Sequence, residues 1–397
     1  MNLLFCLLLA AAGPVEIAEE DIAATFPADV PHIRYLYLDN VEENERDHRL
    51  AVVSYVLNTL STNKKITKPV FIDKEKTVIR FDLRDYGIDA KNYNNFSVDP
   101  YVKKTDKLKK LINAENPIMR ADWFVVKSMV APNSYKLMGV SDLNGFKKRH
   151  GYDAEQAKKL KVEQAAVVIS SGLAKNTRHI KRVQTSTGPF WESRDSASVD
   201  YLIDLLSEKY DSVQILAFNP NGLISYFAAD NKGKALDYLN ADVAVDHTKA
   251  FGSDLLVRVA RNCVVCHVNG VIPVDDTVRK FLKHKDITIM TPGKNTADRL
   301  ADLFGAELPV KQDQKVYVEA LEKATDMDSK TFTHKFIAVF TIYYTDLTME
   351  TETKELGMKP EDFRQFCLQS GNPHLVRLVF DDKITRVHFE AAIGGNR

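Results

Sequence analysis

The sequence predicts an α+β protein, with an N-terminal α+β domain that contains β-hairpins and a mostly α-helical domain after it. Two pairs of β-rich runs enclose short turns, and amphipathic helical patterns stand among them without a regular strand–helix alternation. Beyond residue 246 the patterns are mainly helical. A chain of 397 residues is long enough for two domains. We expect the α+β domain over residues 19–245, the helical domain over 246–360 and a C-terminal extension over 361–397.

The N-terminal region shows both periodicities. Ile79 and Phe81 alternate with Arg80 and Asp82, which is the pattern of a half-buried strand. The run at 42–60 instead places its apolar residues on one helical stripe. The Asn-Pro-Asn-Gly sequence at 219–222 is a turn signal between two β-rich runs. We expect strands at 34–38 and 122–126, helices at 42–60 and 154–169, and hairpins with arms at 69–73 and 77–83 and at 213–218 and 223–229.

The C-terminal region is expected to be mostly helical. The run at 331–347 is rich in Phe and Tyr, and it is too short and too polar at its ends to span a membrane. An aromatic run of this kind is typical of a buried core helix. We expect helices at 275–285, 296–304, 316–323, 331–347 and 361–368, and two β-like runs at 375–380 and 384–389.

The first residues resemble a secretory signal. Leu3 to Leu9 form an apolar run, and Ala10 to Ala12 supply small residues for cleavage. We therefore expect residues 1–18 to be a signal peptide and leader, and the protein to be exported to the periplasm or an equivalent space. The apolar run is too short for a membrane span, so no stable membrane insertion is expected after its removal. The formal net charge of zero gives no indication of a nucleic-acid partner.

A Cys-x-x-Cys-His motif at 263–267 carries the main functional signal, because this sequence is the attachment signature of c-type haem. On a helix, Cys263, Cys266 and His267 are related as i, i+3 and i+4 and leave from one face. Two thiols can then reach the vinyl groups of one porphyrin while the imidazole ligates its iron. The motif predicts one covalently attached haem c.

The residues before the motif predict a longer helix that ends there. Ser253 can cap a helix start, and the apolar residues from Leu255 to Ala260 continue one stripe. We expect the haem to lie on the buried face of this helix.

Other readings of the motif stay open: a redox dithiol, half of a zinc site, or a chance match. A zinc site needs further ligands at suitable spacing, whereas the remaining cysteines, Cys6 and Cys367, are far apart in the sequence. A thioredoxin-like dithiol should open a helix after a strand, but here the motif is expected to close one.

The sixth iron ligand decides the function of such a haem, because methionine favours electron transfer and an open position permits ligand chemistry. We favour Met290, which precedes Thr291-Pro292 in an expected loop. The alternatives are Met327, His247, His284 and His334.

Several segments occur together in the order found in one family. These are Arg-Phe-Asp-Leu-Arg-Asp-Tyr-Gly at 80–87, Arg-Ala-Asp-Trp-Phe-Val at 120–125, Ser-Ser-Gly-Leu-Ala-Lys-Asn at 170–176, Phe-Asn-Pro-Asn-Gly-Leu at 218–223, and the motif at 263–267. The chain resembles a family of exported bacterial cytochrome c domain proteins, common in planctomycetes and some proteobacteria. The resemblance implies an α+β region before a cytochrome c-like haem domain, and it implies haem and export rather than a particular reaction.

The first functional hypothesis is single-electron transfer with a redox partner protein that the sequence does not identify. A haem-dependent oxidoreductase or peroxidase-like enzyme with an open distal site is the second hypothesis. A binding module in which haem has a structural or sensory role is the third.

Overall fold

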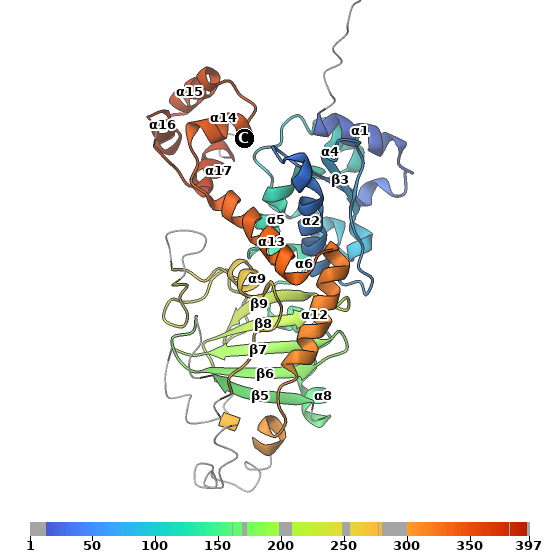
Figure 1. Cartoon of the computed structure of the whole chain (residues 1–397), viewed down its shortest axis with the longest axis vertical. Helices are drawn as coiled ribbons and strands as arrows, with labels where there is room; N and C mark the ends of the chain where they lie inside the picture. Colours follow the sequence, from blue (N-terminus) through green and yellow to red (C-terminus); the bar gives the residue numbers. More distant parts are fainter. Residues whose placement is uncertain are drawn as a thin grey trace, which may run out of the picture.

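The computed structural model describes residues 13–160, 162–168, 173–197, 209–247, 255–276, 278–279, 300–380 and 382–394. These residues form a four-stranded sheet, a five-stranded sheet and helices that connect and cover them (Figure 1). Helices and mainly antiparallel strands are not arranged as repeating βαβ units, so the predicted α+β class is confirmed.

The four-stranded sheet has the order β2-β3-β1-β4, in which β1 pairs antiparallel with β3 and parallel with β4. Its strands are β1 (Ile33–Tyr37), β2 (Val70–Phe71), β3 (Val78–Asp82) and β4 (Ile118–Arg120). Side chains alternate between the two faces. Tyr35 and Val78 pack in a smaller core with α1 (Pro14–Ala24) and α4 (Asp106–Ile112), whereas Leu36 and Ile79 belong to the main core. The predicted strand at 34–38 and the first predicted hairpin are confirmed.

Helix α1 includes residues that the sequence assigned to a leader. Ala18 and Ile22 are buried against the sheet, and the Tyr35 hydroxyl donates a hydrogen bond to Asp21 Oδ2 at 2.6 Å. Residues from Pro14 onward are therefore part of the packed fold. The apolar run at 3–9 lies outside the described residues.

The five-stranded sheet is an antiparallel meander in sequence order. Its strands are β5 (Glu163–Val168), β6 (Arg178–Gln184), β7 (Pro189–Asp195), β8 (Ser212–Phe218) and β9 (Ile224–Asp230). The second predicted hairpin is confirmed as β8 and β9. The predicted helix at 154–169 is wrong in its second half, because only α8 (Ala154–Lys159) is helical and the residues after it pair with β6.

The turn between β8 and β9 connects the five-stranded sheet to α2 (Arg46–Thr59). Asn219 and Ser225 both donate side-chain hydrogen bonds to the carbonyl oxygen of Thr59, at 2.7 and 2.8 Å. Asn221 donates to the carbonyl oxygen of Asn58 at 2.9 Å. These bonds satisfy carbonyl groups at the C-terminal end of α2 that have no partner within the helix. The turn signal therefore also marks a contact between distant parts of the chain.

Helices α12 (Val310–Thr325) and α13 (Ser329–Tyr344) join the two sheets (Figure 1). Helix α12 packs on α2, and α13 packs on α2 and on α5 (Ala121–Ser128). One hydrophobic core includes Leu57, Phe190, Val264 and Phe336. The core is thus continuous across the boundary expected near residue 245.

The chain ends in four helices beyond α13: α14 (Met349–Glu355), α15 (Pro360–Gln369), α16 (Pro373–Val379) and α17 (Arg386–Gly394). The β-like runs predicted at 375–380 and 384–389 are wrong, because both lie largely in helices. Asn372 caps α16 and Pro373 occupies its first turn, which are helix-start signals. The strand predicted at 122–126 is likewise helical, as part of α5.

The remaining described elements are short. They are η1 (Val30–His32), η2 (Glu43–Glu45), η3 (Leu83–Tyr86), α3 (Ala90–Asn94), α6 (Asn133–Met138), α7 (Leu143–Arg149) and α9 (Arg261–His267). The helix predicted at 275–285 lies largely outside the described residues. Of the helix predicted at 296–304, residues 300–304 are described and are helical. In the part of the chain that the structure describes, no helix is long and apolar enough to cross a bilayer.

Candidate functional site

The Cys-x-x-Cys-His motif lies in α9, a helix of seven residues that lies above β9 in Figure 1. The expected i, i+3 and i+4 relation of Cys263, Cys266 and His267 is therefore present on a helix. The side of α9 that is buried carries Val264, which is fully inaccessible to solvent. Cys263 is half-buried and Cys266 is exposed. His267 is half-buried like Cys263, and the expectation that a haem lies on the buried face of this helix stays a prediction.

The helix also starts later than the sequence predicts. Residues 255–260 are not helical, and Ala260 precedes α9 with a positive φ of 65°. The backbone N–H of Val259 donates to the carbonyl oxygen of Asp237 at 3.0 Å, and its carbonyl accepts from the N–H of Ala131 at 3.1 Å. These hydrogen bonds to distant segments replace the intrahelical bonds of the expected longer helix. Ser253 lies outside the described residues.

Polar contacts hold the start of α9 in place. The side-chain amide of Asn262 donates to Asp246 Oδ2 at 2.6 Å, and Asn262 Oδ1 accepts from the backbone N–H of Arg258 at 2.8 Å. The guanidinium of Arg261 lies 5.2 Å from the centre of the Tyr344 ring on α13, which is within the range of a cation–π interaction. Helix α9 is therefore fixed on both sides of its first turn.

The loop after α9 is bound to α12 and α13. The hydroxyl of Tyr317 donates to the carbonyl oxygen of Val268 at 2.8 Å. The hydroxyls of Ser329 and Thr333 each donate to Asn269 Oδ1 at 2.7 Å. The direction in which the chain leaves the motif is thus set by two long helices of the core.

His267 is oriented by this loop. Its Nδ1 atom lies 3.0 Å from the carbonyl oxygen of Gly270. A carbonyl can only accept, so this hydrogen bond places the ring proton on Nδ1 and leaves the lone pair of a neutral imidazole on Nε2. Burial, opposed by the Gly270 bond and assisted by the positive charge of Arg178, lowers the pKa of His267 to about 4. The imidazole is therefore neutral at pH 7, with one nitrogen in the form that ligates a metal.

The two thiols are protonated at neutral pH. Burial raises the pKa of Cys263 to about 11, and burial together with the charge of Asp246 raises the pKa of Cys266. Redox-active dithiols instead have a thiol whose pKa is lowered, so the environment disfavours that reading of the motif.

Zinc has little support within the part of the chain that the structure describes. Among those residues, no group of three or more His, Cys, Asp or Glu side chains is placed to hold a metal ion. Cys367 is buried in α15.

The candidates for the sixth ligand differ in whether the structure describes them and in how exposed they are. Met290 and His284 lie outside the described residues. Met327 is half-buried in the turn between α12 and α13, where its backbone N–H donates to Thr325 Oγ1 at 3.3 Å. His247 and His334 are exposed to solvent.

Sequence reasoning missed the residues that orient the motif. Gly270 and Tyr317 act on His267 and on the loop that follows it. Only Gly270 had a local signal, a glycine three residues after the motif histidine. Tyr317 is distant in the sequence, and only the fold reveals its contact.

Comparison of the chain with protein-family models, with curated proteins and with solved structures finds no match. The function must therefore be inferred from the motif and its geometry.

Proposed function

We propose that this protein is an exported monohaem c-type cytochrome that transfers single electrons, and that it belongs to the bacterial cytochrome c domain family that its sequence resembles. The observation that carries this proposal is the hydrogen bond between His267 and Gly270. It orients a neutral imidazole on the same helix as the two thiols. A motif match alone would not require this second contact.

Each residue of the motif has a distinct role in the proposal. Cys263 and Cys266 would form thioethers, in which each S–H adds across one vinyl double bond without a net change in oxidation state. His267 would ligate the iron through Nε2, with its ring orientation set by Gly270. When bound, the haem supplies one-electron redox chemistry, and the protein tunes it through ligation, hydrogen bonding and burial.

The direct test is the intact mass of the full chain produced in a host that attaches c-type haem. We expect a mass increase equal to one haem that survives denaturation, together with the visible spectrum of haem c. The double variant Cys263→Ser/Cys266→Ser should carry no covalent haem, and the control Cys367→Ser should carry it normally. A colourless wild-type product from a competent host would overturn the proposal.

The sixth ligand is proposed to be Met290. A low-spin spectrum that cyanide and carbon monoxide leave unchanged would support electron transfer, whereas a high-spin haem that binds them readily would favour the enzymatic alternative. Met290→Ala should change the axial-ligand signature and Met327→Ala should not. The opposite result would assign the ligand to Met327.

A further inference from the structure

A pocket of about 250 Å³ lies between the end of β1, α2, α5, α13 and the end of α14. Its volume is below the range of about 300–1,000 Å³ that holds drug-sized ligands, so its occupant must be smaller. Part of its lining consists of branched aliphatic side chains, Val52, Val53, Val125, Val339 and Ile342. Such a lining fits a short apolar group.

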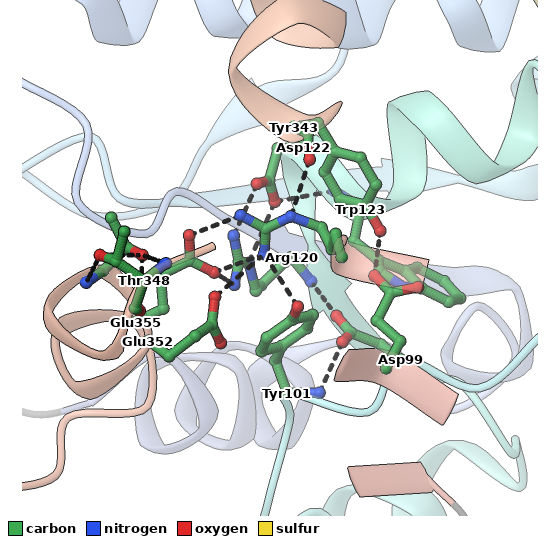
Figure 2. A network of polar contacts seen from close by, with 12 residues as sticks. Asp99, Tyr101, Arg120, Asp122, Trp123, Tyr343, Thr348, Glu352 and Glu355 are labelled. Carbon is green, nitrogen blue, oxygen red and sulfur yellow. Dashed lines mark hydrogen bonds and ion pairs between the residues drawn. The ribbon is translucent and has the colours of Figure 1, made fainter. Parts of the chain in front are cut away.

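The lining also includes Arg120, Asp122 and Glu355, which belong to a network of paired charges (Figure 2). Arg120 donates to Asp122 Oδ2 at 2.6 Å and to Glu355 Oε2 at 2.8 Å. Arg386 donates to both oxygens of Glu355, at 2.6 and 2.7 Å. Because each of these carboxylates already has a guanidinium partner, the network is a fixed frame for the pocket rather than a source of free charge.

Two other charged residues at the pocket, Arg49 and Asp39, do not belong to this network. Within the described parts of the chain, Arg49 makes no hydrogen bond or ion pair, and its Nε atom is buried without a partner. Asp39 is half-buried and makes no ion pair among those residues, although it has a hydrogen bond to Asn40 and feels the positive charge of Arg120. Buried polar groups are generally paired, and leaving them unpaired costs free energy. A ligand acceptor at Arg49 would therefore satisfy a buried donor, and a ligand cation at Asp39 would give that carboxylate a charged partner.

The charges limit the chemistry of such a ligand. A simple anion would pair with Arg49 but would be repelled by Asp39 and by Glu42 at the same pocket, whereas Glu45 is already paired with Lys335. A simple cation would pair with Asp39 and be repelled by Arg49. A small zwitterion that also carries an apolar group satisfies both residues and the aliphatic lining.

We propose that this pocket binds a free α-amino acid with an aliphatic side chain. Its carboxylate pairs with Arg49, its ammonium group pairs with Asp39, and its side chain packs against the valines and Ile342. The frame includes Arg120 and Asp122, which belong to the segment 120–125 that the sequence singled out without a chemical role.

The test is isothermal titration of the full chain with L-leucine, with 4-methylpentanoate and 3-methylbutylamine as probes that each lack one charge. We expect saturable binding of L-leucine, and binding at least about tenfold weaker for each single-charge probe, because each lacks one charge-assisted hydrogen bond. Equal binding of either probe, or absence of L-leucine binding at millimolar concentration to folded protein, would overturn the proposal.

The variants Arg49→Gln and Asp39→Asn should each weaken L-leucine binding by about tenfold or more. Asp47→Asn is the matched control, because Asp47 is an exposed acid on α2 that pairs with Lys76, and it should bind as the wild type does. If Arg49→Gln fails to fold, Arg49→Lys keeps the charge but loses the planar fork, and it should bind more weakly. Unchanged binding in folded Arg49 and Asp39 variants would contradict the assignment. The titration does not depend on haem, so its failure is separable from failure of the proposed function.

Discussion

Arg182 on β6 and Asp313 on α12 form a buried bidentate ion pair, with Nε–Oδ2 and Nη2–Oδ1 distances of 2.8 and 2.9 Å. The indole N–H of Trp191 also donates to Asp313 Oδ2, at 3.0 Å. Arg182 and Asp313 are only 6% and 2% exposed. This contact joins the five-stranded sheet to α12, which packs on α2.

Replacing Asp313 by alanine should leave Arg182 buried without a counter-charge. We expect Asp313→Ala to lower the free energy of unfolding by about 3–5 kcal/mol, measured by urea denaturation. The control is Glu319→Ala on the same helix, where an exposed carboxylate lies 3.9 Å from Lys315, and its effect should stay within about 0.5 kcal/mol. A similar loss of unfolding free energy in both variants would show that the buried pair contributes no more to stability than an exposed carboxylate does.

Gly270 should not tolerate a side chain. Its φ is +97°, and a Cβ atom there would contact Gln314 Oε1 and come within 2.7 Å of the Tyr317 ring. Gly270→Ala should lower the free energy of unfolding by about 1–3 kcal/mol, and in haem-loaded protein it should alter the spectrum by moving the carbonyl that orients His267.

Gly371→Ala provides the matched control for this substitution. Gly371 also has a positive φ, of +63°, but a Cβ atom there meets nothing within 4 Å. The control should show only the backbone cost of about 1 kcal/mol and an unchanged haem spectrum. An equal effect at both positions would mean that crowding around the motif loop has no role.

Glu352 should make stability fall as the pH rises. Burial, and then the negative charge of Glu355, raise the pKa of Glu352 to about 8. Between the ordinary carboxyl pKa and pH 8, the folded state holds a proton that the unfolded state has lost, so raising the pH favours unfolding. Glu352→Gln removes this effect and should be more stable than wild type at pH 9, by on the order of 2–4 kcal/mol.

At pH 4 the Glu352→Gln variant and the wild type should be about equally stable, because the carboxyl is then protonated in the folded state and largely protonated in the unfolded one. Glu350→Gln, on the exposed face of α14, serves as the control and should show no such dependence on pH. A stability difference that does not change between pH 4 and pH 9 would contradict the shifted pKa.

His150, in contrast, should make stability fall as the pH falls. Burial, with the nearby charge of Arg149, lowers the pKa of His150 to about 3. Below the ordinary histidine pKa of about 6.5, the unfolded state binds a proton that the folded state does not bind until about pH 3. Stability from this residue is thus present above pH 6.5 and is lost as the pH falls.

From pH 7 to pH 5, wild type should lose about 2 kcal/mol more than His150→Phe, measured by denaturation at each pH. His334→Gln, which changes an exposed histidine on α13, should follow the wild-type profile. Parallel profiles for wild type and His150→Phe would contradict the prediction.

Elements with a strong local pattern could be predicted from the sequence. The helix at 42–60 appears as η2 and α2, and both hairpins form where alternation and turn residues indicate them. The errors lie in short apolar runs, where helix and strand have similar patterns. The residues of β5 form a strand because they pair with β6. The residues of α16 form a helix that is capped by Asn372.

The helical placement of the motif could be predicted from the sequence, but its surroundings could not. The spacing of Cys263, Cys266 and His267 correctly implied one helical face. The longer helix expected before the motif was wrong because Val257 and Val259 form backbone hydrogen bonds with residues 237–239 instead. The contacts of Gly270 and Tyr317 depend on segments that the fold brings together, which a local pattern does not contain.

The shortness of α9 bears on when the proposed haem could be attached to the chain. A helix of seven residues is far below the length of about 12–15 residues at which isolated helices become even marginal in water. Its shape therefore persists only while Val264 is held in the core and Asn262 is held by Asp246. An attachment enzyme that acted on the unfolded chain would bind a flexible motif. One that acted after folding would find the two thiols and the imidazole already held on one helix.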